Sequence, residues 1–388
     1  MSLHTKTLTY TPPKTSLKTK LFNYQHDAAL ALSQLPHALL HFPMGAGKSL
    51  TAIAAADILI HTLKSQNIKV LIIAPKAILH NFLSQIRKHS TYTANIGHNP
   101  DIEATFTLIN VESLHKLPPQ PCDILILDEC QGLRNPKTQK FQKVQKIVQD
   151  GRTAHVWGLS GTPKINKNSD NLTLDRLCSN PVTWINLPPD VHSQLEQALP
   201  KLIIHVYGLP TNMNDWPNQP KHIHYENWPQ GLGEISDEEF DHLQHIIDHP
   251  DYIGLTKILY TRQLCSAAQT KLQFTNDLLL HPDVQAHGML AFAEFQHTRQ
   301  LLLELGFHNF THSGQTGNIT LSHRSHAQGI ELTSQSHLLF LDTPWSLPML
   351  LQAIARTRRH GCSHPEIHVH IPLLPPEFPV WNKILDKI

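Results

Sequence analysis

The chain lacks three features that would define other classes of protein. No apolar run approaches the roughly 18 residues that a membrane-spanning helix needs, and the first residues lack the hydrophobic stretch of a secretory signal. The five cysteines show no Cys-x-x-Cys spacing, which argues against a zinc module and fits a reducing compartment. We therefore expect an intracellular protein, cytoplasmic or nuclear, without a membrane partner.

The chain also lacks a strong net charge. With a net charge of +1, any contact with nucleic acid must come from local basic patches rather than from bulk attraction. The 29 histidines are unusual, and we interpret most of them as surface polar residues. One group, Cys362, His364, His368 and His370, has metal-binding residue types. However, His368 and His370 alternate along a predicted strand, 367–371, so we do not interpret the group as a metal site.

The most informative stretch is residues 41–49, which read His-Phe-Pro-Met-Gly-Ala-Gly-Lys-Ser between an apolar run and an alanine-rich helix, 50–59. Strand, glycine turn, lysine, hydroxyl and helix is the arrangement that binds phosphates. Lys48 would reach the β- and γ-phosphates, and the Ser49 hydroxyl would bind Mg²⁺. Phe42 stands where the full P-loop pattern has its first glycine. The predicted nucleotide-binding residues here are Met44, Gly45, Ala46, Gly47, Lys48 and Ser49.

A second stretch, 123–131, reads Asp-Ile-Leu-Ile-Leu-Asp-Glu-Cys-Gln. Four consecutive apolar residues predict a buried parallel strand, and two carboxylates follow at the end where such sheets bind ligands. Asp128 would hold Mg²⁺, and Glu129 would orient or deprotonate the attacking water. Together with the P-loop, this pair predicts a site that hydrolyses a nucleoside triphosphate.

Strands and helices alternate along most of the chain, which predicts parallel sheets in an α/β fold. The predicted strands are 38–40, 69–74, 105–110, 124–127, 154–159, 202–209, 288–293, 318–321, 338–341 and 367–371. Predicted helices include 79–89, a block over 237–280, 297–305 and 347–358. We expect a tail at 1–20, a first domain at 21–180, a linker with an insertion at 181–260, and a second domain at 261–388. In the last helix, Arg356 and Arg359 would share one face because they lie three residues apart.

The order of motifs resembles the superfamily 2 helicases and translocases, most closely their Swi/Snf-type branch. The P-loop and the Asp-Glu strand are followed by Leu-Ser-Gly-Thr-Pro-Lys-Ile-Asn at 159–166, which is similar to the family's coupling motif. In the second half, 322–333 resembles the fifth motif, and 342–361 resembles the segment that carries the family's arginine fingers. The resemblance covers most of residues 21–371 and implies two RecA-like doubly wound domains in tandem.

The resemblance also implies roles for further residues. Tyr24 and Gln25 would read the adenine base, Gly329 and Glu331 of the fifth motif would contact the nucleotide, and Arg356 and Arg359 would act on the γ-phosphate. Candidate contacts to nucleic acid are Lys76, Ser113, Arg134 and Lys164 in the first domain, and His297, Arg299 and Arg324 in the second.

We therefore predict an ATP- and Mg²⁺-dependent motor on nucleic acid, with translocation on duplex DNA favoured over strand separation of DNA or RNA. A clamp with a degenerate ATP site is disfavoured by the intact Lys48, Asp128, Glu129 and arginines. A P-loop switch that regulates a partner protein without nucleic acid stays an alternative. A virus, phage or mobile element is a source that the small size would fit.

Overall fold

The computed structural model describes the chain in two compact units, Met1–Ser193 and Gln194–Ile388. The described residues are 16–64, 67–97, 103–116, 122–133, 135–150, 153–161, 173–208, 223–226, 241, 245, 255–311, 314–322, 332–344, 346–359 and 362–385. No described helix is both long enough and apolar enough to cross a membrane.

The first unit is built on a seven-stranded sheet in which all described strand pairs are parallel. The strand order is β3-β4-β2-β5-β6-β1-β7. The strands are β1 (His37–His41), β2 (Val70–Ile73), β3 (Ala94–Ile96), β4 (Phe106–Ile109), β5 (Ile124–Asp128), β6 (His155–Ser160) and β7 (Thr183–Asn186). The predicted parallel α/β fold is confirmed for this unit.

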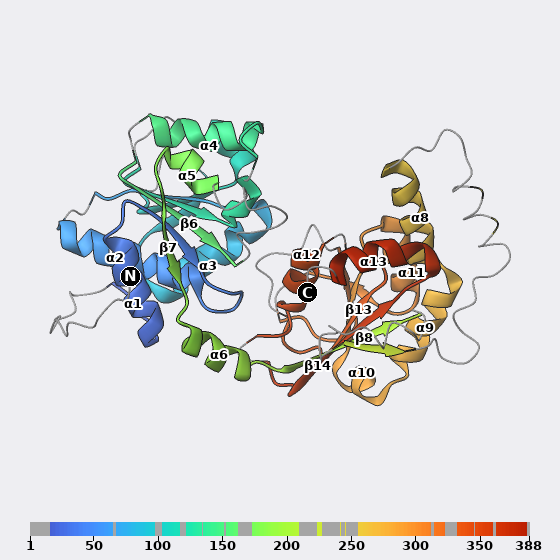
Figure 1. Ribbon diagram of the computed structural model, residues 1–388. Coiled ribbons are helices and arrows are strands. Elements are labelled where there is room, and N and C mark those ends of the chain that lie inside the picture. The colour runs from blue at the N-terminus through green and yellow to red at the C-terminus, as the bar shows by residue number, and fades with distance from the viewer. Residues whose placement is uncertain are drawn as a thin grey trace. The chain divides into compact units, whose positions relative to one another are not determined.

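Helices cover both faces of this sheet because its strands are apolar on both faces (Figure 1). Leu125 and Leu127 of β5 pack with Phe141 and Val144, on the face that α4 and α5 cover. The other face is covered by α1, α2 and α3 (Figure 1). The helices are α1 (Asn23–Ser33), α2 (Lys48–Leu63), α3 (Leu79–His89), α4 (Gln139–Gln149) and α5 (Thr173–Cys178).

The second unit has its own seven-stranded parallel sheet, in the order β11-β12-β10-β13-β14-β8-β9. Its strands are β8 (Lys201–Tyr207), β9 (Ile223–Glu226), β10 (Met289–Phe292), β11 (His308–Asn309), β12 (Ile319–Leu321), β13 (His337–Phe340) and β14 (Glu366–Pro372). The chain thus forms two parallel-sheet α/β domains in tandem, as predicted.

The two faces of the second sheet bury different side chains. Leu338 and Phe340 of β13 pack with Leu350 and Trp381, from α12 and α13, in one core cluster. Leu339 packs on the other face with Phe274, Val284 and Leu302, which come from α9, α10 and α11. The helices of this unit are α6 (Pro189–Gln197, which spans the boundary), α8 (Leu255–Ala267), α9 (Gln269–Leu279), α10 (Pro282–His287), α11 (Gln296–Glu304), α12 (Leu347–Ile354) and α13 (Phe378–Leu385).

The segment expected to be a linker, 181–260, contributes strands to both sheets where it is described. β7 pairs with β1 in the first sheet, and β8 pairs with β14 over seven residues in the second. Much of the remainder, such as 209–222 and 227–240, lies outside the described residues. The tail is described from Ser16, where an isolated antiparallel bridge joins Leu17 to Ser90.

Candidate functional site

The turn between β1 and α2 has the backbone of a phosphate-binding loop. Gly45 and Gly47 both have positive φ values, 82° and 80°, which glycine adopts without a Cβ penalty. Gly47 is the N-cap of α2, and its left-handed conformation starts the helix directly at Lys48. No acidic residue lies in the first turn of α2, so the first N–H groups of this helix present a positive terminus to the loop.

Tyr24 and Gln25 of α1 lie against this loop. The Tyr24 hydroxyl donates to the Ala46 carbonyl at 3.2 Å, and Gln25 Nε2 approaches the same carbonyl at 3.5 Å. Gln25 is only 4% exposed, and its Oε1 accepts a hydrogen bond from the Phe22 N–H at 3.1 Å. A Cβ placed on Gly47 would lie 2.3 Å from Gln25 Nε2. The two residues predicted to read the base therefore touch the backbone of the loop.

Lys48 lies between the loop and the end of β6. Its Nζ donates to the Phe42 carbonyl at 3.1 Å and to the Pro43 carbonyl at 3.3 Å. Gly161, which follows β6, approaches so closely that a Cβ added to it would lie 3.2 Å from Lys48 Nζ. β1 and β6 are neighbouring parallel strands, so the sheet itself brings these two segments together.

Asp128 is the last residue of β5, the neighbour of β6 on its other side, and Glu129 follows it. Burial raises the pKa of the Asp128 carboxyl to about 7, and the charge of Glu129 adds to the rise, whereas Lys48 opposes it. Glu129 has a φ of 50°, a conformation that costs a residue with a Cβ about 1–2 kcal/mol. The Glu129 N–H donates to Asp128 Oδ1 at 3.0 Å, and this bond helps to hold the strained turn.

A hydrogen-bonded chain joins this acidic pair to the end of β6. Gln131 Nε2 donates to Glu129 Oε2, and Gln131 Oε1 accepts a hydrogen bond from Ser160 Oγ at 2.8 Å. Gln131 and Ser160 are both buried. The position of the Glu129 carboxylate is therefore fixed by the end of the strand that also carries Gly161.

These residues fit a nucleoside triphosphate with Mg²⁺. The open space around Gly45, the helix terminus and the Lys48 ammonium suit the phosphates. Half-buried Ser49 and Asp128 would hold Mg²⁺, which prefers oxygen ligands and keeps several waters. When bound, the ion would neutralise the charge that develops on the phosphate oxygens.

Two of the predicted nucleic-acid contacts are described in the first unit. Lys76 begins a short 3-10 helix, η1 (Lys76–Ile78), after β2 and is exposed. Ser113 lies in η2 (Val111–Lys116) after β4 and is half-buried. β2 and β4 are paired parallel strands. Lys76 and Ser113 therefore follow the C-terminal ends of their strands, at the same end of the sheet as the P-loop. Arg134, Lys164, Arg324, Gly329 and Glu331 lie outside the described residues.

The second unit holds the remaining candidates. His297 is exposed on α11, and Arg299 of the same helix is half-buried. The prediction that Arg356 and Arg359 lie on one helical face is wrong, because α12 ends at Ile354 and both arginines lie in the turns that follow. Arg358 ties these turns down, since its Nε donates to the Pro200 carbonyl at 2.8 Å and its Nη1 contacts Glu196 Oε2 at 3.0 Å. Arg356 is buried and Arg359 half-buried.

Two contacts at the site were not predicted from the sequence. Gln131 and Ser160 belong to motifs in the sequence, but the sequence predicts no role for either side chain. Gly161 was not expected to approach Lys48. The sequence signal for both contacts is that their residues lie at or just after strand ends. Strands β5, β6 and β1 are neighbours in the sheet but are widely separated along the chain, so the sequence does not show the contacts themselves.

Comparison with known proteins gives one family match, which lies in the first unit. Residues 18–165 match the family described as type III restriction enzyme, res subunit. The comparison with curated proteins gives no match. Among solved structures, the chain is similar to the SWI2/SNF2 ATPase core of Sulfolobus solfataricus in complex with dsDNA, with 15% identity, 98% of this chain and 94% of that chain covered, and a TM-score of 0.42.

The match includes the P-loop, the Asp128–Glu129 pair and the Ser160–Gly161 turn. The whole candidate nucleotide site of the first unit therefore lies within the segment that is similar to this family.

Proposed function

We propose that the chain is an ATP-driven translocase on nucleic acid, with duplex DNA as its preferred track. The observation that carries the proposal is the convergence of three strand ends on one edge of the first sheet. These ends supply Lys48, the Asp128–Glu129 pair and Ser160–Gly161, which are linked by hydrogen bonds or close contact. Lys76 and Ser113 follow further strand ends on that edge.

In this mechanism Lys48 binds the β- and γ-phosphates, and Glu129 accepts a proton from the attacking water. Gln131 holds the Glu129 carboxylate in place through its hydrogen bond. Because Gln131 also accepts from Ser160, a change at the end of β6 would reach the catalytic base through this one side chain. This link supports a motor in which nucleic acid contacted by the segment after β6, where Lys164 lies, controls hydrolysis.

The second unit would complete the motor. We infer that Arg356 and Arg359 act on the γ-phosphate when the two domains close, and that Gly329 and Glu331 contact the nucleotide. Arg134 and Arg324, with His297 and Arg299, would grip the phosphate backbone. Such contacts are independent of base sequence, so binding should weaken as salt rises.

The preference for duplex DNA is supported by the order of sequence motifs, which resembles the Swi/Snf-type branch. The proposal is tested by ATPase rates without nucleic acid and with duplex DNA, single-stranded DNA or RNA, each at low and high salt. We expect the largest stimulation with duplex DNA, lost at high salt, and no turnover in Lys48→Ala or Glu129→Gln.

The other outcomes separate the alternatives. Stimulation by single strands alone would favour a strand-separating helicase. A basal rate that no polymer changes at low salt would favour a switch that acts on a protein partner. As a control, Glu103→Gln changes a carboxylate that pairs with Lys69 at 2.9 Å, away from the site, and should leave every rate unchanged.

A further inference from the structure

A row of histidines crosses the second sheet on one face. It consists of His205 on β8, His368 and His370 on β14, and His337 on β13, and we call it the histidine row. Their rings are stacked. The ring centroids of His205 and His370 are 5.1 Å apart with an interplanar angle of 9°, and those of His337 and His370 are 5.2 Å apart with an angle of 5°. The residues that alternate with them, such as Val369 and Leu338, belong to the core on the opposite face. Within this row His337 and His370 are buried, whereas His205 and His368 are half-buried.

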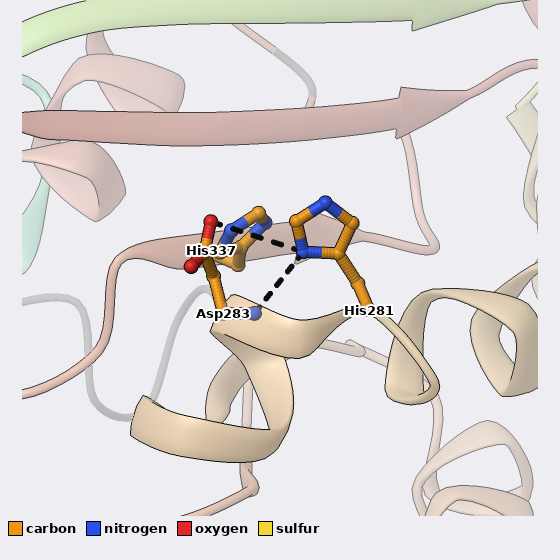
Figure 2. Close-up of side chains that lie close together, drawn as sticks. All are labelled: His281, Asp283 and His337. Atoms are coloured by element: carbon orange, nitrogen blue, oxygen red, sulfur yellow. Dashed lines mark hydrogen bonds and ion pairs between the residues drawn. The ribbon is translucent and has the colours of Figure 1, made fainter.

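At one end of the row, His337 meets two residues from the start of α10. His281 is the N-cap of this helix, and Asp283 lies in its first turn. One ligand atom from each of His281, Asp283 and His337 can be chosen so that all three lie within 4.8 Å of one another. Figure 2 shows the three side chains converging, with the His281 ring and the Asp283 carboxylate on either side of His337.

The two ring nitrogens of His337 have different surroundings among the described residues. Its Nδ1 is hydrogen-bonded to His370 Nε2 at 2.9 Å. Its Nε2 is buried, and no hydrogen-bond partner for it exists among the described residues. His337 is only 3% exposed, and a buried polar atom without a partner is costly. The structure thus holds an unpaired ligand atom next to an imidazole and a carboxylate.

We propose that His281, Asp283 and His337 bind a divalent transition-metal ion of the zinc type, with water as the fourth ligand. Two imidazoles and one carboxylate suit Zn²⁺, whereas Mg²⁺ and Ca²⁺ prefer oxygen ligands alone. In a tetrahedral zinc site the ligand atoms lie about 3.3 Å apart, and His281 Nδ1 is already 3.9 Å from Asp283 Oδ2. Both of these side chains are exposed, so they can close the remaining distance and admit the ion from solution.

The hydrogen bonds behind His337 determine which of its ring nitrogens is available to a metal ion. Metal at Nε2 puts the proton on Nδ1, which then donates to His370 Nε2. His370 Nδ1 in turn donates to the Tyr207 oxygen, 3.0 Å away. A ligand histidine held by such a second hydrogen bond is the usual arrangement in metal sites.

The proposed site has a structural role and is independent of the proposed motor function. His337 is the first residue of β13, whereas catalytic groups of parallel sheets follow the ends of strands. Metal would tie the start of α10 to β13. His281 Nδ1 now accepts from the Asp283 N–H at 3.3 Å, a long cap bond that metal at this nitrogen would replace.

The test is titration of the untagged, chelator-treated chain with Zn²⁺ by calorimetry, with the melting temperature measured in parallel. The test variants are His281→Asn, which keeps a good N-cap residue, and Asp283→Asn. The controls are His308→Ala and Asp277→Asn, which change exposed residues of the same types in the same unit. The absorption spectrum of the Co²⁺-loaded chain gives a second readout, because it reports a tetrahedral nitrogen and oxygen site.

We expect one Zn²⁺ equivalent that both controls retain and that each test variant loses or binds at least about 10-fold more weakly. The zinc-dependent rise in melting temperature should disappear in the same two variants. Wild-type chain without a stoichiometric site, or test variants that bind Zn²⁺ as the wild type does, would overturn the proposal. ATPase activity enters none of these readouts, so failure here leaves the proposed function intact.

Discussion

Gly47 illustrates how closely single residues are fitted at the nucleotide site. Only glycine fits this position, for two reasons. Its φ is 80°, and a Cβ added here would lie only 2.3 Å from Gln25 Nε2. At Gly45 only the first reason applies, because its φ is 82° but the space around an added Cβ is open. The pair therefore allows backbone strain and side-chain collision to be separated.

We predict that Gly47→Ala weakens ATP binding at least about 10-fold, whereas Gly45→Ala costs only the left-handed backbone term of about 1–2 kcal/mol. In Gly47→Ala the new methyl group must displace Gln25, which contacts the loop and is buried. ATP affinity by calorimetry and unfolding by urea measure the two effects. Gly47→Ala should weaken ATP binding less in the Gln25→Ala background than in the wild type, and an equal loss in both backgrounds would show that collision with Gln25 is not the cause.

Asp342 is a buried carboxyl at the end of β13 with an altered titration. Burial raises its pKa to about 6, although the N–H of Glu294 and the charges of Arg262 and Lys271 oppose the rise. In the unfolded chain an aspartate titrates near about 3.9. The folded chain therefore binds the Asp342 proton more tightly than the unfolded chain does. The protonated carboxyl contributes fully to the unfolding free energy below about pH 4, and this contribution is lost as pH rises through about 6.

We predict that between pH 4.5 and 7.5 the wild type loses about 2 kcal/mol more unfolding free energy than Asp342→Asn does. The asparagine cannot ionise, so the variant lacks this contribution. Urea unfolding of both proteins across the pH range measures the difference, and all other titrating groups cancel in it. Parallel pH profiles would show that Asp342 titrates as in the unfolded chain.

At the scale of elements, local pattern predicts most of the fold. The apolar run at 124–127 and the carboxylates after it correctly predict β5 and the edge where ligands would bind. The helix at 79–89 is found at those residues. These predictions succeed because burial on both faces of a parallel strand and the apolar stripe of a helix are written in consecutive residues.

Other elements depend on partners far away in the chain. β8 has a strand pattern, but only its pairing with β14, about 165 residues later, assigns it to the second sheet. The end of α12 at Ile354 has no glycine or proline to mark it, and Arg358 holds the following turns through the segment before β8. The alternation of His368 and His370 is visible in the sequence, but the burial of His370 depends on elements packed from elsewhere.

A buried ion pair in the second unit joins two elements that are far apart in the sequence. Lys271 of α9 contacts Glu377 at 2.7 Å, and the two side chains are 0% and 1% exposed. Glu377 ends η6 (Pro375–Glu377) and also accepts from Thr343 and the Leu374 N–H. Lys271 donates to the Leu341 carbonyl at 2.7 Å as well, so each charge has further hydrogen-bond partners besides the ion pair.

We predict that Lys271→Met or Glu377→Gln lowers the unfolding free energy by about 3–5 kcal/mol, because each removes one partner of a buried pair. A double-mutant cycle should show strong coupling between them. The control is Glu366→Gln, which breaks the exposed pair with Lys201 at 3.1 Å and should cost less than about 1 kcal/mol. Equal losses in the buried and exposed pairs would contradict this account.

The turns after α12 carry the prediction for catalysis in the second unit. We expect Arg356→Ala and Arg359→Ala to lower kcat strongly with little change in ATP affinity, because a charge brought in on domain closure acts mainly in the transition state. Single-turnover rates and nucleotide binding separate the two effects. Arg358→Ala is the control, since its side chain is held by Pro200 and Glu196 and should affect stability more than kcat.

A tenfold weaker ATP affinity with unchanged kcat would make either arginine a ground-state binder. That outcome would remove the main support for action on domain closure. It would leave the chemistry assigned to Lys48 and Glu129 in the first unit unaffected.

At the scale of the whole molecule, the chain joins two parallel-sheet units and carries a net charge of only +1. A motor with this charge must bind nucleic acid through local contacts to the phosphates, and these contacts must be released in each cycle of ATP hydrolysis. A protein that only binds DNA and hydrolyses ATP in place would need the same contacts. Stimulation of hydrolysis alone therefore does not distinguish movement from static binding.

The most direct test of the central claim is the steady-state ATPase rate at saturating concentrations of duplex DNA, measured against the length of the duplex. A translocase spends longer on a longer track before it leaves, so we predict a rate that rises with duplex length to a plateau and is highest on closed circles. Glu129→Gln should show no rate at any length. A wild-type rate that is the same on the shortest and longest duplexes and on circles would contradict translocation.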